Sequence, residues 1–190
     1  MRALKDRILR DGKNLGQGIL KVDSFINHQV DASLMLEAGR ELAAEFVGVG
    51  ATKVLTAEIS GIAPALTTAL ALDVPLIYAR KTKPVTMTEP VYVEAAPSHT
   101  KGVSVFLMCS PEFLGPDDRI LIIDDFLASG QTIMALVRMV RHAGAELVGI
   151  GALIEKTFEG GRSDLEQLGV PLHALVAVTD MSDGRFTFAE

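Results

Sequence analysis

The chain has 190 residues, of which 48% are hydrophobic and 22% charged, and its 18 basic side chains are outnumbered by 24 acidic ones. This length suits a single domain, and the hydrophobic content excludes a chain that is disordered throughout, because disorder requires few apolar residues and a high net charge. The net charge of −6 disfavours a general nucleic-acid binder, whose surface would be basic, but leaves room for a local basic patch that binds a small anion.

The N-terminal segment gives no sign of export. Residues 1–10 carry charges throughout and lack the apolar stretch of a secretory signal. The longest uncharged run, residues 59–72, has 14 residues, whereas a membrane-spanning helix needs about 20. Because Cys109 is the only cysteine, no disulfide can form within the chain. These features predict a cytoplasmic protein with neither a membrane nor nucleic acid among its partners.

The first half of the chain predicts a helix followed by a strand–helix–strand unit. Asp31 is placed to cap a helix that ends near two glycines. The apolar positions of this helix recur every four residues, at Leu34, Ala38, Leu42 and Phe46. The next elements are a strand, a turn, a helix and a second strand, over residues 54–57, 58–61, 62–72 and 76–79.

The second half predicts further buried strands and one helix. The strands cover residues 105–109, 120–123, 147–154 and 172–178, and the helix covers 131–142. The apolar residues run consecutively, which is typical of strands buried on both faces in a parallel sheet covered by helices. Strands that alternate with helices indicate an α/β fold. Open α/β sheets bind ligands at the carboxyl ends of their strands, so the residues that follow each strand are the candidate site.

The segment from Ile120 to Thr132 is the strongest candidate. Four apolar residues are followed by Asp124 and Asp125, then by a short loop of small residues and the start of a helix. Backbone N–H groups there would be free, the helix dipole favours an anion, and Gly130 would let the backbone approach it closely. The pattern predicts a phosphate-binding loop that is not a Walker loop, because the sequence G-x-x-x-x-G-K-[ST] is absent.

Two adjacent carboxylates beside this loop would repel a bare phosphate. They suit a ligand that presents hydroxyl groups or a bound cation next to its phosphate, as a sugar phosphate does. The simpler alternative is that Asp124 and Asp125 only end a strand and cap a turn. The four histidines show no metal-ligand spacing, so no metal ligands are predicted in the chain.

This 13-residue segment resembles the motif that binds phosphoribosyl diphosphate (PRPP) in the type I phosphoribosyltransferases. That motif has four apolar residues, two acids, three loop residues and then Ser/Thr-Gly-x-Ser/Thr, and every position is filled here. Most of the chain is similar, in the same order, to the bacterial xanthine phosphoribosyltransferases. The similarity is carried by residues 20–29, 60–65, 79–81, 122–128, 149–151 and 154–156, and it is weakest across 89–98 and at the C-terminal tail.

The resemblance implies a role for each matching position. It implies that Asp124 and Asp125 are the catalytic residues and face the ribose hydroxyls. It implies that the 5′-phosphate of PRPP is bound by Ala128, Ser129, Gly130, Gln131 and Thr132. It places on the diphosphate side Ser60, Gly61, Arg80 and Lys81, of which the last two could reach across a dimer interface. It implies purine contacts for Leu20, Asn27 and Lys156.

Taken without the resemblance, several of these residues have simpler interpretations. Ser60 and Gly61 fit a plain tight turn, and residues 80–83 fit a solvated run of charge. On the purine side, the simpler interpretations are core packing for Leu20, a turn for Asn27, and an ion pair with Glu155 or Glu159 for Lys156. Phe158 is a candidate for stacking on the base, with core packing as the alternative.

We expect one phosphoribosyltransferase domain over residues 1–190, with an open, mostly parallel sheet flanked by helices. A small hood would be formed mainly by residues 12–30 and the C-terminal region. Residues 81–102 contain three prolines and are too long for an ordinary connection. Long segments of this kind are often active-site lids, which would exclude water here; the alternative is a disordered surface loop without a role.

The activity implied by the resemblance belongs to purine salvage. It is transfer of the 5-phosphoribosyl group from PRPP to xanthine, which gives xanthosine 5′-monophosphate and diphosphate. Mg²⁺ is expected to arrive on PRPP with few direct protein ligands, and the family favours a homodimer. The xanthine preference rests on the resemblance alone. The alternatives are a phosphoribosyltransferase for guanine, hypoxanthine or adenine, and a PRPP-sensing regulator of the same fold that binds nucleic acid.

Overall fold

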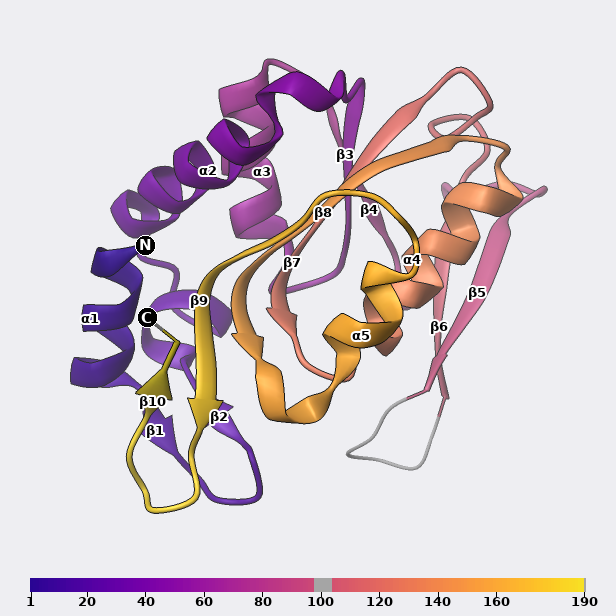
Figure 1. The fold of residues 1–190 in the computed structure, drawn as a ribbon. Helices are drawn as coiled ribbons and strands as arrows, with labels where there is room; N and C mark the ends of the chain where they lie inside the picture. Colours follow the sequence, from indigo (N-terminus) through magenta and orange to yellow (C-terminus); the bar gives the residue numbers. More distant parts are fainter. Residues whose placement is uncertain (98–103, 190) are drawn as a thin grey trace.

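The structure is a computed structural model that describes residues 1–97 and 104–189 (Figure 1). Within these residues, six strands form one sheet in the order β10-β9-β8-β7-β3-β4. They are β3 (Lys53–Ala57), β4 (Leu76–Ala79), β7 (Arg119–Leu127), β8 (Glu146–Lys156), β9 (Leu172–Asp180) and β10 (Thr187–Phe188). All neighbours in this order are parallel except β9 and β10, which are antiparallel. The predicted α/β fold is confirmed.

Helices cover both faces of this sheet (Figure 1). One face packs against α1 (Arg2–Asp11), α2 (Ala32–Phe46) and α3 (Ile62–Leu72), and the other against α4 (Gln131–His142) and α5 (Gly161–Glu166). In β7, Leu121 and Ile123 enter the core beneath α2 and α3, while Ile120 and Ile122 enter the core beneath α4. This double burial accounts for the consecutive apolar run. Among the described residues, no helix is both long enough and apolar enough to cross a membrane.

Several predicted elements are confirmed at their boundaries. The helices α3 and α4 and the strand β4 begin and end at the predicted residues. The carboxylate of Asp31 accepts a hydrogen bond of 3.1 Å from the backbone N–H of Leu34 and so caps α2. The four apolar positions of α2 are buried. These elements form from local signals, namely a cap, a periodic apolar face and a proline in the first turn of α3.

The strand β7 is longer than the sequence predicted. It was expected to end at Ile123, but it continues through both aspartates to Leu127 and stays paired with β8, where Asp124 lies opposite Ala152. The strand continues because the backbone of these polar residues still bonds to a central neighbour, whatever their side chains do. The two carboxylates are therefore held on a rigid strand rather than on a loop.

The strand at residues 105–109 lies outside the main sheet, contrary to the prediction. It is β6 (Ser104–Cys109), which pairs antiparallel with β5 (Tyr92–Pro97) in a separate hairpin. Leu107 and Cys109 are buried, whereas Phe106 is 53% exposed. An apolar residue on the outer face hid the alternation that marks a strand with one buried face.

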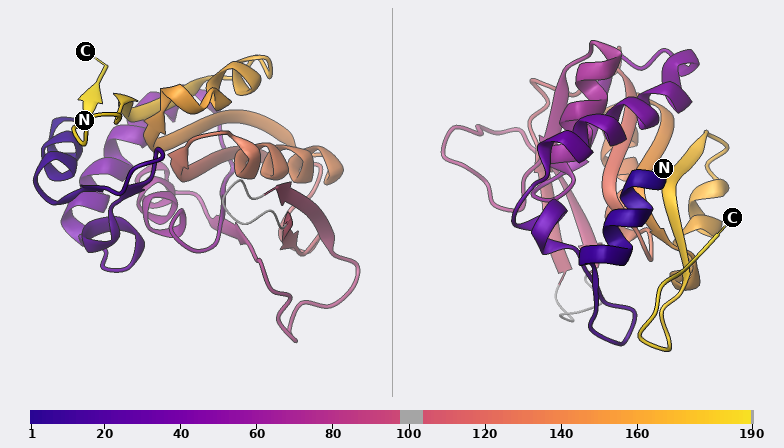
Figure 2. Two further views of the ribbon diagram at one scale, coloured as in Figure 1. Left: turned by 90° about the horizontal axis from the view of Figure 1, so that it is seen from below. Right: turned by 90° about the vertical axis from the view of Figure 1, so that its left-hand side faces the viewer.

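The predicted lid segment is not a continuous loop. Within residues 81–102 the structure forms β5, which packs beside α4. Residues 98–102 of the segment lie outside the described residues. Figure 2 shows the β5–β6 hairpin projecting from the body of the sheet near the phosphate-loop side of the molecule. A role as a lid stays a prediction.

The N- and C-terminal segments meet at one end of the molecule. Two short strands, β1 (Lys13–Asn14) and β2 (Leu20–Lys21), form a hairpin followed by a π-helical turn, Asp23–Asn27. The side-chain amide of Asn14 donates to the backbone oxygen of Met181 at 2.5 Å. Figures 1 and 2 show this hairpin beside the β9–β10 turn. The two segments predicted to form the hood are thus in contact. Neither α1, α5 nor β10 was among the predicted elements, and two 3₁₀ turns cover Val47–Val49 and Thr157–Glu159.

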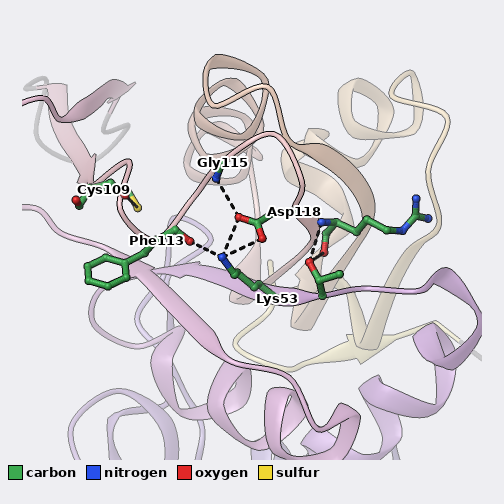
Figure 3. A network of polar contacts seen from close by, with 8 residues as sticks. Lys53, Cys109, Phe113, Gly115 and Asp118 are labelled. Carbon is green, nitrogen blue, oxygen red and sulfur yellow. Dashed lines mark hydrogen bonds and ion pairs between the residues drawn. The ribbon is translucent and has the colours of Figure 1, made fainter.

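A polar network fastens the amino ends of the central strands (Figure 3). The ammonium of Lys53, at the start of β3, lies 2.9 Å from the carboxylate of Asp118 and donates to the backbone oxygen of Phe113 at 2.8 Å. Asp118 also accepts a hydrogen bond of 2.9 Å from the N–H of Gly115. Nearby, burial raises the pKa of the Cys109 thiol to about 11, so it is protonated at neutral pH. This end of the sheet is built for stability, opposite the edge where the strands' carboxyl ends lie.

Candidate active site

A cavity of about 890 Å³ opens at the carboxyl ends of β7 and β8. It is bounded by the β1–β2 hairpin of the predicted hood, the phosphate-binding loop predicted at residues 128–132 and the β5–β6 hairpin. The predicted site residues that line it are Lys81, Asp124, Asp125, Ala128, Ser129, Gly130, Gln131, Thr132 and Lys156. Those that do not line it are Leu20, Asn27, Ser60, Gly61 and Arg80. The structure therefore brings together the residues predicted for the ribose and the 5′-phosphate with Lys81 and Lys156, and leaves the other five outside the cavity wall.

The two carboxylates of β7 are nearly enclosed. Asp124 is 6% exposed and Asp125 is 8% exposed. The N–H of Asp125 donates to the carboxylate of Asp124 at 2.9 Å. Burial, reinforced by the charge of Asp125, raises the pKa of Asp124 well above its usual range, and Lys81 opposes this rise. A carboxylate pair in this state gains from any ligand that donates hydrogen bonds to it.

The phosphate-binding loop joins β7 to α4. Gly130, the residue before α4, has a φ of +74°, which glycine adopts without the steric cost that a side chain would add. Its backbone oxygen accepts the N–H of Met134 at 2.8 Å, which starts the helix. In the described structure no side chain caps this helix. The first N–H groups of α4 are thus left for an anion in the cavity.

Glu58, which the sequence analysis did not select, joins two of the predicted diphosphate residues, Arg80 and Lys81, of which Lys81 lines the cavity. One carboxylate oxygen of Glu58 lies 2.8 Å from Nε of Arg80, and the other accepts the backbone N–H of Lys81 at 2.6 Å. The charge of Arg80 is therefore paired with Glu58 in this structure. The available signal was positional: Glu58 follows β3 and Arg80 follows β4, and these parallel strands are neighbours in the sheet.

The turn at Ser60 and Gly61 lies against Asp124. A methyl group placed on Gly61 would come within 2.7 Å of the carboxylate oxygen Oδ1 of Asp124 and 2.3 Å of the hydroxyl of Thr56. Gly61 is buried, and Ser60 is partly exposed. Gly61 therefore allows the turn to pack directly on Asp124, although neither turn residue reaches the cavity wall.

Lys156 lies at the end of β8 and faces the hood. Its ammonium donates to the backbone oxygen of Gly18 at 3.0 Å and pairs with Glu159, and it lies 5.8 Å from the centre of the Phe126 ring. The ion pair with Glu159 is the simpler of the interpretations open from the sequence, and it coexists with a place on the cavity wall. A lysine ammonium has three donors, so two fixed partners leave one for a ligand.

The other two predicted purine contacts, Leu20 and Asn27, do not line this cavity, and their contact with a purine stays a prediction. Leu20 is 7% exposed and belongs to the core, as its simpler interpretation held. Asn27 is exposed at the end of the π-helical turn. The cavity wall is instead formed by residues that sequence reasoning missed or left open, Gln17, Gly18, Ile19, Ala96, Pro97, Phe158 and Glu159. Phe158, a candidate for stacking on the base, is 44% exposed. For the others, the only sequence signal is proximity to predicted positions.

The chain can now be compared with known proteins. Residues 30–166 match the phosphoribosyl transferase domain family. A xanthine phosphoribosyltransferase of Deinococcus deserti is 51% identical over 97% of this chain and 95% of its own length, and one of Streptococcus pneumoniae P1031 is 48% identical over 100% of this chain and 98% of its own.

A likeness in fold accompanies the likeness in sequence. The crystal structure of adenine phosphoribosyltransferase from Thermoanaerobacter pseudethanolicus superposes with a TM-score of 0.75 at 23% identity, covering 92% of this chain and 99% of that one. The open, mostly parallel sheet with helices on both faces is that of the type I enzymes. From the matched domain and the full-length similarity we conclude that this chain belongs to the phosphoribosyltransferase family.

Proposed function

We propose that the chain transfers the 5-phosphoribosyl group of PRPP to xanthine, with release of diphosphate and formation of xanthosine 5′-monophosphate. The observation that carries this proposal is one cavity in which the phosphate-binding loop, two buried carboxylates and Lys156 converge. The choice of xanthine is supported by the two curated relatives, which are named xanthine phosphoribosyltransferases.

In this mechanism the protein orients PRPP and stabilises charge. The 5′-phosphate binds the amides and hydroxyls of residues 128–132, and the ribose hydroxyls donate to Asp124 and Asp125. As the bond from C1 to diphosphate breaks, positive charge builds on the ribose beside these carboxylates. A nitrogen of the purine then bonds to C1 and loses its proton, while diphosphate leaves with the electron pair of the broken bond. No covalent intermediate with the protein is needed, because positioning alone contributes up to about 7–11 kcal/mol in favourable cases.

Negative charge collects on the leaving diphosphate. Lys81 lines the cavity and is close enough to lower the pKa of Asp124, so its ammonium is available to this charge. Mg²⁺ bound to PRPP would supply further neutralisation. Such a cation keeps its waters and binds substrate phosphates, so it needs few direct protein ligands.

The base is read at the end of β8 and under the hood. The third donor of Lys156 is free to bond to an oxygen at position 6 of the purine. The same contact would serve guanine and hypoxanthine. Adenine carries an amino group at that position and would meet a second donor, which is unfavourable.

A panel of bases tests the proposal. With PRPP and Mg²⁺, nucleotide formation from xanthine, guanine, hypoxanthine and adenine is followed by chromatography, and kcat/KM is expected to be highest for xanthine. A higher kcat/KM for guanine or hypoxanthine would identify that base as the preferred substrate, while the proposed mechanism would remain supported. Absence of nucleotide with all four bases would contradict phosphoribosyl transfer itself.

Lys156 provides a prediction about which substrate is affected. Lys156→Ala removes the donor to the purine, so the KM for the purine is expected to rise about tenfold or more, as for a lost charged hydrogen bond, while the KM for PRPP stays within a factor of about three. The comparison variant is Lys81→Ala, which also changes a lysine that lines the cavity and should raise the KM for PRPP instead. Equal effects of Lys156→Ala on both constants would contradict a purine contact.

The proposed enzyme is a cytoplasmic homodimer. Its contact surface would use the edge strand β4 and the turn beside it, where Ile59 is 74% exposed and Tyr78 is 42% exposed. Arg80 and Lys81 follow the same edge strand, so a partner there would lie next to the diphosphate side. Sedimentation velocity tests this assembly, and a monomer at micromolar concentration would contradict it.

A further inference from the structure

The backbone of the phosphate-binding loop rests on a second backbone segment, the turn that starts α5. The N–H of Gly161 donates to the backbone oxygen of Ala128 at 3.0 Å. A methyl group on Gly161 would come within 2.4 Å of that oxygen and within 2.5 Å of the nitrogen of Gly130 and the carbonyl carbon of Ser129. These neighbours are main-chain atoms, which cannot rotate away as the end of a side chain can.

Gly130, in the phosphate-binding loop, packs in turn against Gly161 and against Leu165 of α5. A methyl group on Gly130 would point at the turn, 3.3 Å from the backbone oxygen of Gly161 and 3.6 Å from a methyl of Leu165. Leu165 is fully buried in the core beneath α4. The phosphate-binding loop is therefore packed between the cavity on one side and α5 on the other.

An ion pair ties α5 to the sheet immediately beside this contact. Nε of Arg162 donates to one carboxylate oxygen of Glu155 at 2.7 Å, and Nη2 donates to the other at 2.5 Å. Glu155 is 1% exposed. In the pairing of β7 with β8 it lies opposite Leu127, the residue before the phosphate-binding loop.

We propose that Gly161 and the Glu155–Arg162 pair are positioning residues that hold the phosphate-binding loop in the shape that receives the 5′-phosphate of PRPP. This inference rests on the proposed function. None of the three residues lines the cavity, so they act only through the loop. The placement of the loop's donors matters for the reaction, because a shift of about 1 Å in oriented groups can cost about 100-fold in rate.

The main test is Gly161→Ala. The added methyl displaces residues 128–130, so the KM for PRPP is expected to rise about 100-fold, whereas the KM for the purine changes less than about threefold. The matched control is Gly39→Ala. A methyl on Gly39 would lie 2.5 Å from a backbone carbon of Thr67, between α2 and α3 and away from the cavity. It should lower Tm while leaving the KM for PRPP unchanged.

Arg162→Lys tests the ion pair with a milder change. Lysine keeps the charge but loses the two parallel hydrogen bonds of the guanidinium. The KM for PRPP is expected to rise about tenfold or less, and Arg162→Met, which leaves Glu155 buried without a partner, should exceed it in both KM and loss of Tm. This series keeps the proposal falsifiable if Gly161→Ala does not fold.

A readout without substrates separates this inference from the proposed function. In the ligand-free protein, the N–H of residue 161 donates to Ala128 and the N–H of Met134 donates to Gly130. Amide hydrogen exchange at these two positions should accelerate in Gly161→Ala and Arg162→Lys, and not in Gly39→Ala. If exchange accelerates but the wild-type protein makes no nucleotide, the proposed function fails, while the role of Gly161 and the Glu155–Arg162 pair in holding the loop is supported. If the wild-type protein is active while neither exchange nor the KM for PRPP changes in these variants, the proposal that these residues hold the loop is refuted.

Discussion

Replacing Asp124 and Asp125 together by asparagine is expected to lower kcat by about 10²–10³ and at the same time to make the protein more stable at neutral pH. The loss of turnover follows from removing the negative charge that faces the developing positive charge on the ribose. The gain in stability follows from their burial, because two enclosed and adjacent carboxylates are costly to keep ionised. Asparagine at position 124 can still accept the N–H of residue 125.

The stability gain has a definite pH dependence. The pKa of Asp124 is raised in the folded protein, chiefly by burial, so the folded state binds a proton more tightly than the unfolded state. Stability from this group is complete below about pH 4 and is lost as the pH rises through the raised folded pKa. The difference in Tm between variant and wild type should therefore be largest at neutral pH and shrink toward acid pH.

Asp118→Asn is the matched control, since Asp118 precedes the same strand at its opposite end (Figure 3). The change weakens the contact with Lys53, where the two side chains are 13% and 26% exposed, and is expected to cost about 1 kcal/mol of stability without altering kcat. Chromatographic rates and thermal unfolding measure both quantities. Near-normal turnover in the double variant, or a fall in kcat with Asp118→Asn, would contradict the roles assigned to the two ends of the sheet.

The sequence predicted those features that depend on residues close together in the chain, and missed those that depend on contacts between distant segments. The helix α3 and the run from Ile120 to Thr132 depend on neighbours within a few residues, so caps, glycines and apolar periodicity suffice to find them. The pairing of Glu58 with Arg80 depends on β3 and β4 being adjacent, and strand order cannot be read from local patterns. The contact of Gly161 with Ala128 likewise appears only once the chain has folded.

Apolar residues are the hardest to assign from the sequence, because a core position and a cavity wall both suit them. Leu20, to which the resemblance gives a purine contact, packs in the core, while its neighbours Gly18 and Ile19 line the cavity; the purine contact itself stays a prediction. Phe106 made β6 look like a strand buried on both faces, although it lies on the open face of a hairpin. Hydrophobicity indicates that a residue prefers to be buried, but it does not indicate which surface buries it.

Gly61→Ala is expected to lower kcat/KM for PRPP about 100-fold, through displacement of the ribose carboxylates rather than loss of a contact with substrate. The new methyl would lie 2.3 Å from the hydroxyl of Thr56, 2.7 Å from Oδ1 of Asp124 and 3.2 Å from the backbone oxygen of Ala57. Thr56 is fully buried and Ala57 contributes main chain, so the turn or Asp124 has to move. Gly48→Ala is the control, because a methyl there meets nothing within 4 Å. Initial rates at varied PRPP, measured below the Tm of each variant, make the comparison. Unchanged kcat/KM in Gly61→Ala would mean that PRPP turnover does not depend on how closely this turn packs against Asp124.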